Sequence, residues 1–166
     1  MKEILVSPTR RIDIMIGRML GGATTGLFQG MLVLVLCLCI GIDVSMVVSL
    51  PLALCFMIVL SFLFTAFGII IASLLPDFQG FQLIMNFLIM PLMFLSGAMF
   101  PLSTTPVWLQ MIARFDPLSY AVDGIRRALT GNSFFTPWMD GVVLLGLMFL
   151  FVVLGGYFFS RMRADD

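Results

Sequence analysis

The chain has 166 residues, of which 61% are hydrophobic and 11% are charged, and its nine basic residues balance its nine acidic ones. A soluble domain is about half apolar and about a quarter charged, so this composition excludes an ordinary soluble domain and predicts a membrane protein. The sequence contains no histidine, which removes Ser/His and Cys/His nucleophiles and the commonest zinc ligand. We therefore expect no enzymatic activity, no cofactor or metal in this chain and no nucleic-acid partner.

Four long apolar runs predict an all-α, polytopic membrane protein with a single transmembrane domain over residues 1–166. An α-helix rises about 1.5 Å per residue and must cross about 30 Å of hydrocarbon, so each span needs roughly 20 residues. The predicted transmembrane helices cover residues 19–42, 52–75, 81–101 and 139–160. Pro91 is expected to kink the third of them.

The segment 1–18 precedes the first span and mixes charged with apolar residues. Ser7 before Pro8 predicts a helix start. Apolar residues then share one helix face and arginines another, which is typical of a segment that rests on the membrane surface: Ile12, Met15, Ile16 and Met19, against Arg11 and Arg18. Two interpretations stay open, a positively charged membrane anchor and a docking element for a cytoplasmic partner.

Small residues at four-residue spacing mark the first span. Gly22, Gly26 and Gly30 form a smooth helix face, which lets two membrane helices approach closely. We favour contact with another helix of the same chain over contact with a second subunit.

Three uncharged polar residues lie in the spans, namely Gln29 in the first and Gln82 and Asn86 in the third. They are candidates for lining a transport path if they face a shared interior, although hydrogen bonding between helices is the commoner role of such groups. No ionisable residue lies in the middle of a span, which argues against proton or ion coupling. Energy for any transport would therefore come from elsewhere.

A helical hairpin is predicted at residues 102–130, before the last span. Thr105–Pro106 and Asp116–Pro117 each combine a polar cap with proline at the first helical position, and Gly131 supplies a stop. In the second helix the apolar residues form one face and the charged residues lie elsewhere, which predicts a helix at the membrane interface: Leu118, Val122, Ile125 and Leu129, against Asp123, Arg126 and Arg127.

Positive charge predicts the orientation. Six basic residues flank the first and last spans, and three lie on the opposite side: Lys2, Arg10, Arg11, Arg18, Arg161 and Arg163, against Arg114, Arg126 and Arg127. The positive-inside rule then places both termini in the cytoplasm and the hairpin outside.

Two blocks of sequence resemble the permease subunits of type-2 ABC exporters, which move drugs, polysaccharides or lipid-linked glycans. LSGAMFPL, PVWLQ and DPLSYAVDGIRRAL resemble the signature between the last two spans of these permeases. EILVSPTRR resembles the cytoplasmic segment that meets the ATPase.

The resemblance implies a permease in a bacterial or archaeal inner membrane that works as a homodimer or heterodimer with two cytoplasmic ATPase subunits, which carry the ATP. It implies that the ATPase-coupling residues are Glu3, Leu5, Ser7, Pro8, Arg10 and Arg11. It implies that the residues of the outer gate and hairpin are Ser96, Gly97, Phe100, Pro101, Pro117, Leu118, Tyr120, Asp123 and Arg126.

Such permeases usually have six spans, and the two that should precede EILVSPTRR are missing from this sequence. A fragment, a mis-assigned start and a naturally shortened subunit are all open. The alternative function is a truncated or degenerate membrane scaffold without transport activity of its own.

Overall fold

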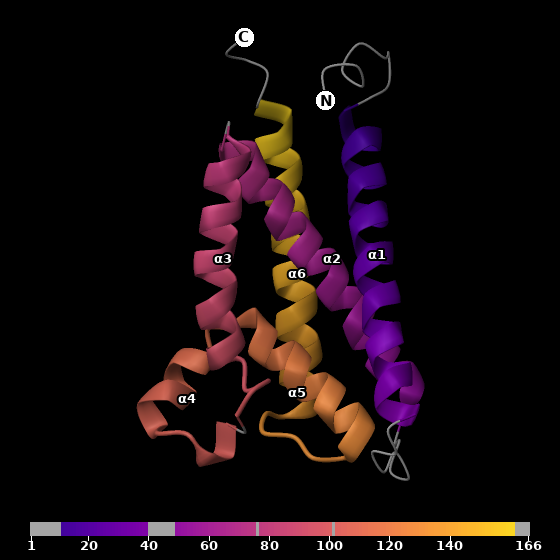
Figure 1. Cartoon of the computed structure of the whole chain (residues 1–166), viewed down its shortest axis with the longest axis vertical. Coiled ribbons are helices and arrows are strands. Elements are labelled where there is room, and N and C mark those ends of the chain that lie inside the picture. The colour runs from indigo at the N-terminus through magenta and orange to yellow at the C-terminus, as the bar shows by residue number, and fades with distance from the viewer. Residues whose placement is uncertain (1–10, 40–48, 76, 101, 162–166) are drawn as a thin grey trace.

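The fold consists of four long helices and a short helical hairpin at one end of the molecule (Figure 1). The computed structural model describes residues 11–39, 49–75, 77–100 and 102–161, and these contain helices and turns only. The helices are α1 (Arg11–Cys39), α2 (Leu50–Leu74), α3 (Phe78–Leu95), η3 (Leu102–Thr104), α4 (Val107–Ala113), α5 (Pro117–Thr130) and α6 (Pro137–Arg161).

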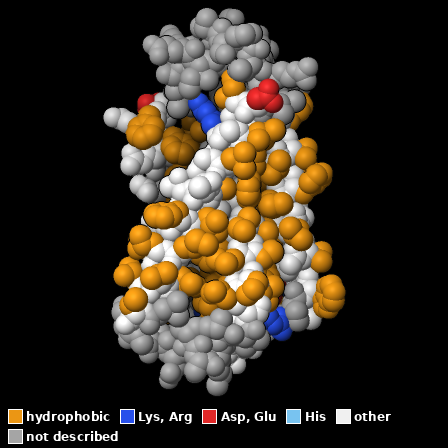
Figure 2. All heavy atoms as spheres, turned by 90° about the vertical axis from the view of Figure 1, so that its right-hand side faces the viewer, with side chains coloured by type: hydrophobic (Ala, Val, Ile, Leu, Met, Phe, Trp, Pro, Cys, Tyr) orange, Lys and Arg blue, Asp and Glu red, His pale blue; other side chains and the backbone are white. Residues whose placement is uncertain are grey.

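The prediction of an all-α protein with four membrane spans is confirmed. α1, α2, α3 and α6 are each long and apolar enough to cross a membrane. The start of α1 and the end of α6 lie at one end of the molecule, and α4 and α5 lie at the other (Figure 1). Hydrophobic side chains cover the middle of the face drawn in Figure 2, and charged side chains appear there only toward the two ends. This distribution suits a protein whose solvent at mid-height is lipid.

The core lies around α2, which packs against α1, α5 and α6. One cluster joins Leu63 of α2 to Tyr120 of α5 and Leu144 of α6. A second cluster joins Met15 and Met19 of α1 to Ala66 of α2. The segment 11–18 therefore belongs to the first membrane helix. Met15 and Met19 pack into the protein, which corrects for these two side chains the prediction that their face rests on the membrane surface, whereas Ile16 of the same face is exposed.

The glycine face of α1 packs against α2 of the same chain. A Cβ atom at Gly22 would lie 2.6 Å from Thr65 Cγ2, and one at Gly26 would lie 3.2 Å from Ser61 Oγ. Gly30 faces Met57 in the same way. Only a helix face without side chains lets α1 come this close to α2.

α3 is the least embedded of the long helices. It has no buried residue among those described, and it ends at Leu95, whereas the sequence predicted a span to residue 101. Gly97 has a φ of 72°, a left-handed conformation that ends the helix at low steric cost. With 18 residues α3 is about 27 Å long, slightly less than the hydrocarbon core of a bilayer.

Candidate functional site

The backbone that follows α3 leaves the helix while it is still close to the other spans. At bilayer depth, irregular backbone must find hydrogen-bond partners within the protein. Arg126 Nη2 donates to the carbonyl oxygen of Gly97 at 2.5 Å. Ser96 Oγ donates to Met93 O at 2.9 Å and accepts from Ala98 N at 3.3 Å. The structure thus brings together Ser96, Gly97 and Arg126, all predicted hairpin residues.

A second set of bonds closes the turn between η3 and α4. Gln110 Nε2 donates to Leu102 O at 3.0 Å and to Thr105 O at 2.9 Å. Thr105 Oγ1 donates to Leu102 O at 2.8 Å, so Thr105 serves this turn. It does not cap α4 as predicted: Pro106 is the N-cap, and α4 begins at Val107.

α5 begins as the sequence predicted, with Asp116 as its cap and Pro117 in its first turn. Asp116 Oδ1 accepts from Leu118 N at 2.9 Å. Ser119 Oγ lies 3.1 Å from Asp116 Oδ2 and 3.3 Å from Leu95 O, the last carbonyl of α3. The start of α5 is therefore fixed to the end of α3. α5 ends at Gly131 in a left-handed conformation, also as predicted.

The polar and small residues of α5 face the protein, which corrects the predicted division of its faces. Asp123 is 2% exposed and lies on the buried side with Tyr120, Gly124 and Ala128. The apolar side chains predicted to form the buried face are only half-buried. The reason is space: α5 packs against α2 and α6, and a Cβ atom at Gly124 would lie 2.5 Å from the ring of Phe56.

Asp123 organises the connection between α5 and α6. Its carboxylate accepts from Phe134 N at 2.8 Å and from Phe135 N at 2.8 Å. The ring of Phe135 stacks on Tyr120 with centroids 4.8 Å apart. Tyr120 Oη donates to Arg114 O at 2.7 Å, and burial raises the pKa of Tyr120, which keeps this hydroxyl protonated.

The sequence analysis assigned no role to Asp140 and considered Arg127 only as a charged residue of the hairpin. Asp140, in the first turn of α6, is fully buried, and neither of its carboxylate oxygens has a hydrogen-bond partner among the described residues. Arg127 Nη1 is also buried without a partner there. The two side chains are close enough to attract each other, with Asp123 nearby. Asp140 is the only acidic residue of α6, and an acid in the first turn of a mostly apolar helix was the signal that could have revealed it.

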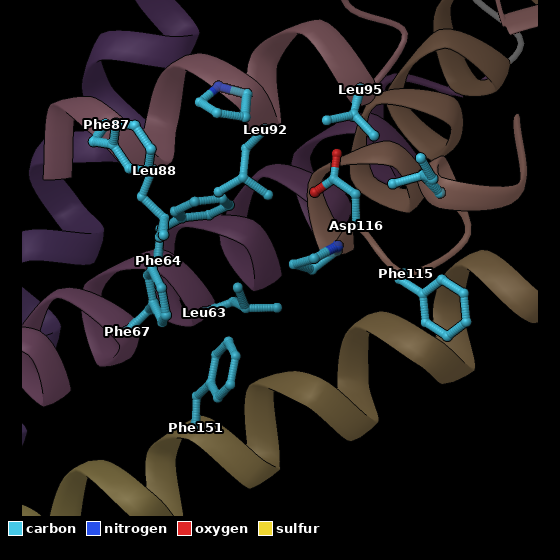
Figure 3. A pocket seen from close by; sticks show the side chains of 13 residues that line it. Leu63, Phe64, Phe67, Phe87, Leu88, Leu92, Leu95, Phe115, Asp116 and Phe151 are labelled. Atoms are coloured by element: carbon cyan, nitrogen blue, oxygen red, sulfur yellow. The ribbon is translucent and has the colours of Figure 1, made fainter. Parts of the chain in front are cut away.

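An apolar cavity of about 370 Å³ lies between α2, α3, α6 and the turn that leads into α5. Rings of Phe64, Phe67 and Phe151 gather on one side of it, and the carboxyl group of Asp116 lies on the other (Figure 3). Burial in this apolar wall raises the pKa of Asp116 to about 6, although the bonds from Leu118 and Ser119 partly offset the effect.

The remaining residues that the sequence analysis predicted as site residues do not take part in the contacts described above. Phe100 is exposed. Gln29, Gln82 and Asn86 are exposed too, and they lie on α1 and α3, which stand on opposite sides of the molecule, so one chain does not bring them together (Figure 1). Glu3, Leu5, Ser7, Pro8, Arg10 and Pro101 lie outside the described residues, and Arg11 begins α1.

Comparison with known proteins gives consistent matches. Residues 1–130 match the family model described as "ABC-2 type transporter". The chain is 30% identical over 155 residues to "Nodulation protein J" of Rhizobium leguminosarum bv. trifolii, covering 92% of this chain and 56% of that protein. It is 27% identical over 130 residues to "Inner membrane transport permease YadH" of Escherichia coli K12, covering 78% and 50%.

A third relative is "Putative transport permease ycf38" of Cyanophora paradoxa, 33% identical over 107 residues, with 64% of this chain and 36% of the relative covered. The chain spans about half the length of the first two relatives, from 50% to 56%. No solved structure matches the chain significantly.

Proposed function

The chain belongs to the ABC-2 type transporter family, and from this premise we propose that it is a permease subunit of an ATP-driven exporter, forming part of the translocation path. The observation that carries the proposal is the outward hairpin. Arg126 of α5 bonds to Gly97 and Ser119 of α5 reaches Leu95. A movement of the outer end of α3 is therefore transmitted to α5, as an outer gate requires.

The energy source lies on other subunits in this proposal. Two cytoplasmic ATPase subunits bind and hydrolyse ATP, and this chain contributes the coupling segment from Glu3 to Arg11. α1 starts at Arg11 and continues for 29 residues without interruption. A displacement of its cytoplasmic end would thus be carried along a stiff helix to the contact with α2. Both termini face the cytoplasm of a bacterial or archaeal cell and the hairpin faces outward, in keeping with the distribution of arginines.

A second permease copy completes the path. Gln82 and Asn86 project from the exposed side of α3, where contact with lipid would leave their amides without hydrogen-bond partners. A homodimer or heterodimer in which α3 faces its counterpart would place these amides along a shared interior. Polar cargo such as a glycan would find hydrogen-bonding groups there, and drugs, lipid-linked glycans and polysaccharides are the cargo classes of the family.

The competing function is a membrane scaffold without transport activity, whose exposed apolar helices only pack against partners. Co-purification separates the two functions. A tagged chain that acts as a permease captures an ATPase subunit from its own membranes, whereas a scaffold captures none.

Charge reversal at the coupling segment is the second test. The double variant Arg10→Glu with Arg11→Glu is expected to lose the ATPase subunit and at least about tenfold of export, a change of about 1.4 kcal/mol in coupling. Arg161→Glu with Arg163→Glu, which changes the charge equally at the other cytoplasmic end, is the matched control. Unchanged export in the Arg10/Arg11 variant would contradict the transporter function.

A further inference from the structure

The cavity beside α3 is the feature that the proposed function leaves without a role. It is bounded on several sides by helices of one chain, and its lining is apolar apart from the carboxyl group of Asp116. The volume of about 370 Å³ is well above the roughly 150 Å³ of an apolar cavity that stays dry in water and takes up benzene. A space of this size within a membrane protein needs an occupant.

Water does not suit this space. A buried water needs two to four polar partners, and Asp116 offers the only polar side chain in the lining. Both of its oxygens already accept hydrogen bonds, Oδ1 from Leu118 N and Oδ2 from Ser119 Oγ. An occupant that makes no hydrogen bonds is therefore favoured.

A helix is about 10–12 Å wide with its side chains. A hydrocarbon chain is thinner and more flexible, and it can therefore enter the space between α3 and the rest of the chain while both stay in place.

The cavity is also in reach of the bilayer. Phe87 and Phe115 belong to its lining and are 77% and 88% exposed, so part of the rim is formed by apolar side chains on the outside of the chain. Inside, the rings of Phe67 and Phe151 stack with centroids 5.3 Å apart (Figure 3). α3 forms one wall of the cavity, and it has no buried residue among those described.

We propose that this cavity binds an acyl chain of a bilayer phospholipid, which fills the space between α3 and the rest of the chain and supports α3 in its position beside the hairpin. Among hydrocarbons the acyl chains of phospholipids surround every span at high concentration. Binding needs no ATPase and no second permease, so the proposal stands apart from the transport function and can fail without it.

Tryptophan fluorescence in vesicles tests the proposal. In a background where Trp108 and Trp138 are replaced by phenylalanine, Phe151→Trp puts a reporter in the cavity. Phe149→Trp puts one on the lipid-exposed side of the same helix, where Phe149 is 69% exposed. Phosphatidylcholine brominated on its acyl chains is expected to quench both reporters. Should Phe151→Trp fail to fold, Phe64→Trp on α2 reports from the same side of the cavity.

Filling the cavity is the decisive comparison. Leu88→Phe with Leu92→Phe adds two rings to the lining, and it is expected to abolish quenching of the cavity reporter while leaving the reporter at position 149 unchanged. A cavity reporter that is never quenched, or that is quenched equally with the cavity filled, overturns the proposal.

Solvent extraction of the purified full chain identifies the occupant. Mass spectrometry is expected to find phospholipid in the unmodified chain and a loss of it in the filled variant. Release of a different amphiphile, such as exported cargo, or of no amphiphile would overturn the assignment to phospholipid.

Discussion

Three aspartates in or near the hairpin carry the same carboxyl group but differ in their surroundings. Asp123 is satisfied by backbone N–H groups of the next loop. Asp116 caps α5 and lies in the wall of the apolar cavity. Asp140 is fully buried, with Arg127 as its nearby opposite charge. Burial of a carboxylate is costly unless hydrogen bonds or an opposite charge compensate it, so each of the three depends on a different neighbour.

Removal of the Asp123 carboxylate should destabilise the protein. Asp123→Ala leaves the N–H groups of Phe134 and Phe135 without their acceptor, and each lost hydrogen bond to a charged group costs about 1.5–3 kcal/mol. We expect the free energy of unfolding in detergent to fall by about 2–4 kcal/mol. Asp77→Ala is the control, because Asp77 is exposed and makes no cap bond, and it should change stability by less than about 0.5 kcal/mol. Equal effects of the two substitutions would contradict the role of Asp123.

Asp116 should make stability depend on pH. Its pKa in the folded chain, about 6, lies above the ordinary value of 3.8. The folded state therefore binds the Asp116 proton more tightly than the unfolded state does. The resulting contribution to the free energy of unfolding is complete below about pH 4 and is lost as the pH rises through 6. Asp116→Asn keeps the helix cap and removes the titration. The stability difference between wild type and variant, measured by unfolding from pH 4 to 7, should shift against the wild type by about 2–3 kcal/mol; a difference independent of pH would refute this.

At the scale of elements, α5 links the hairpin to the core. Its N-terminus is bonded to the end of α3, and near its C-terminus Ala128 O accepts from Ser49 N, the residue that caps α2. Its middle packs on α2 and α6 through Tyr120 and Ala121. A helix held at both ends and along one face moves as a unit with its neighbours.

The close approach of α5 to α2 depends on Gly124. In Gly124→Ala the new Cβ would lie 2.5 Å from the Phe56 ring, and overpacking of this kind costs about 1–3 kcal/mol. We expect a lower unfolding temperature in detergent, and partial recovery when Phe56→Leu is added. Gly146→Ala on α6 is the matched control because nothing lies within 4 Å of that position, so helix propensity should leave stability unchanged or raised by up to about 1 kcal/mol. Gly124→Ala behaving like the control would contradict close packing here.

At the scale of the whole molecule, four long helices place the α2–α3 turn and the hairpin at opposite ends (Figure 1). The distribution of basic residues is what predicts which of these ends faces the cytoplasm. The apolar middle between these ends is exposed over much of the surface, with many large hydrophobic residues more than one-third uncovered. Such a surface suits contact with lipid and with other apolar helices.

Cysteine labelling should report the orientation. After replacement of Cys37, Cys39 and Cys55 by serine, Ser103→Cys in the hairpin is expected to react with a membrane-impermeant maleimide added outside intact cells. Asp77→Cys in the α2–α3 turn should react only after the membrane is opened. Reaction of Asp77→Cys, but not of Ser103→Cys, from outside would reverse the proposed topology.

Much of the fold follows from local sequence. The four apolar runs predict the spans because a bilayer admits only long apolar helices, and the start of α5 follows from Asp116 and Pro117 because caps are local chemistry. The end of α3 was predicted six residues too late because hydropathy continues through Met99 and Phe100 although Gly97 has already ended the helix. Periodicity also assigned Asp123 to the wrong side of α5, since its acceptor role depends on a loop eleven residues away.

The sequence by itself determined the class of protein, the number of spans and the family, since composition, run length and short motifs are properties of neighbouring residues. Tertiary structure alone decided that Gly22 faces Thr65, that Arg126 reaches Gly97, and that Asp140 is buried near Arg127. It also decided that a cavity remains beside α3. These features depend on which helix faces lie opposite one another, and that depends on packing between residues distant in the chain.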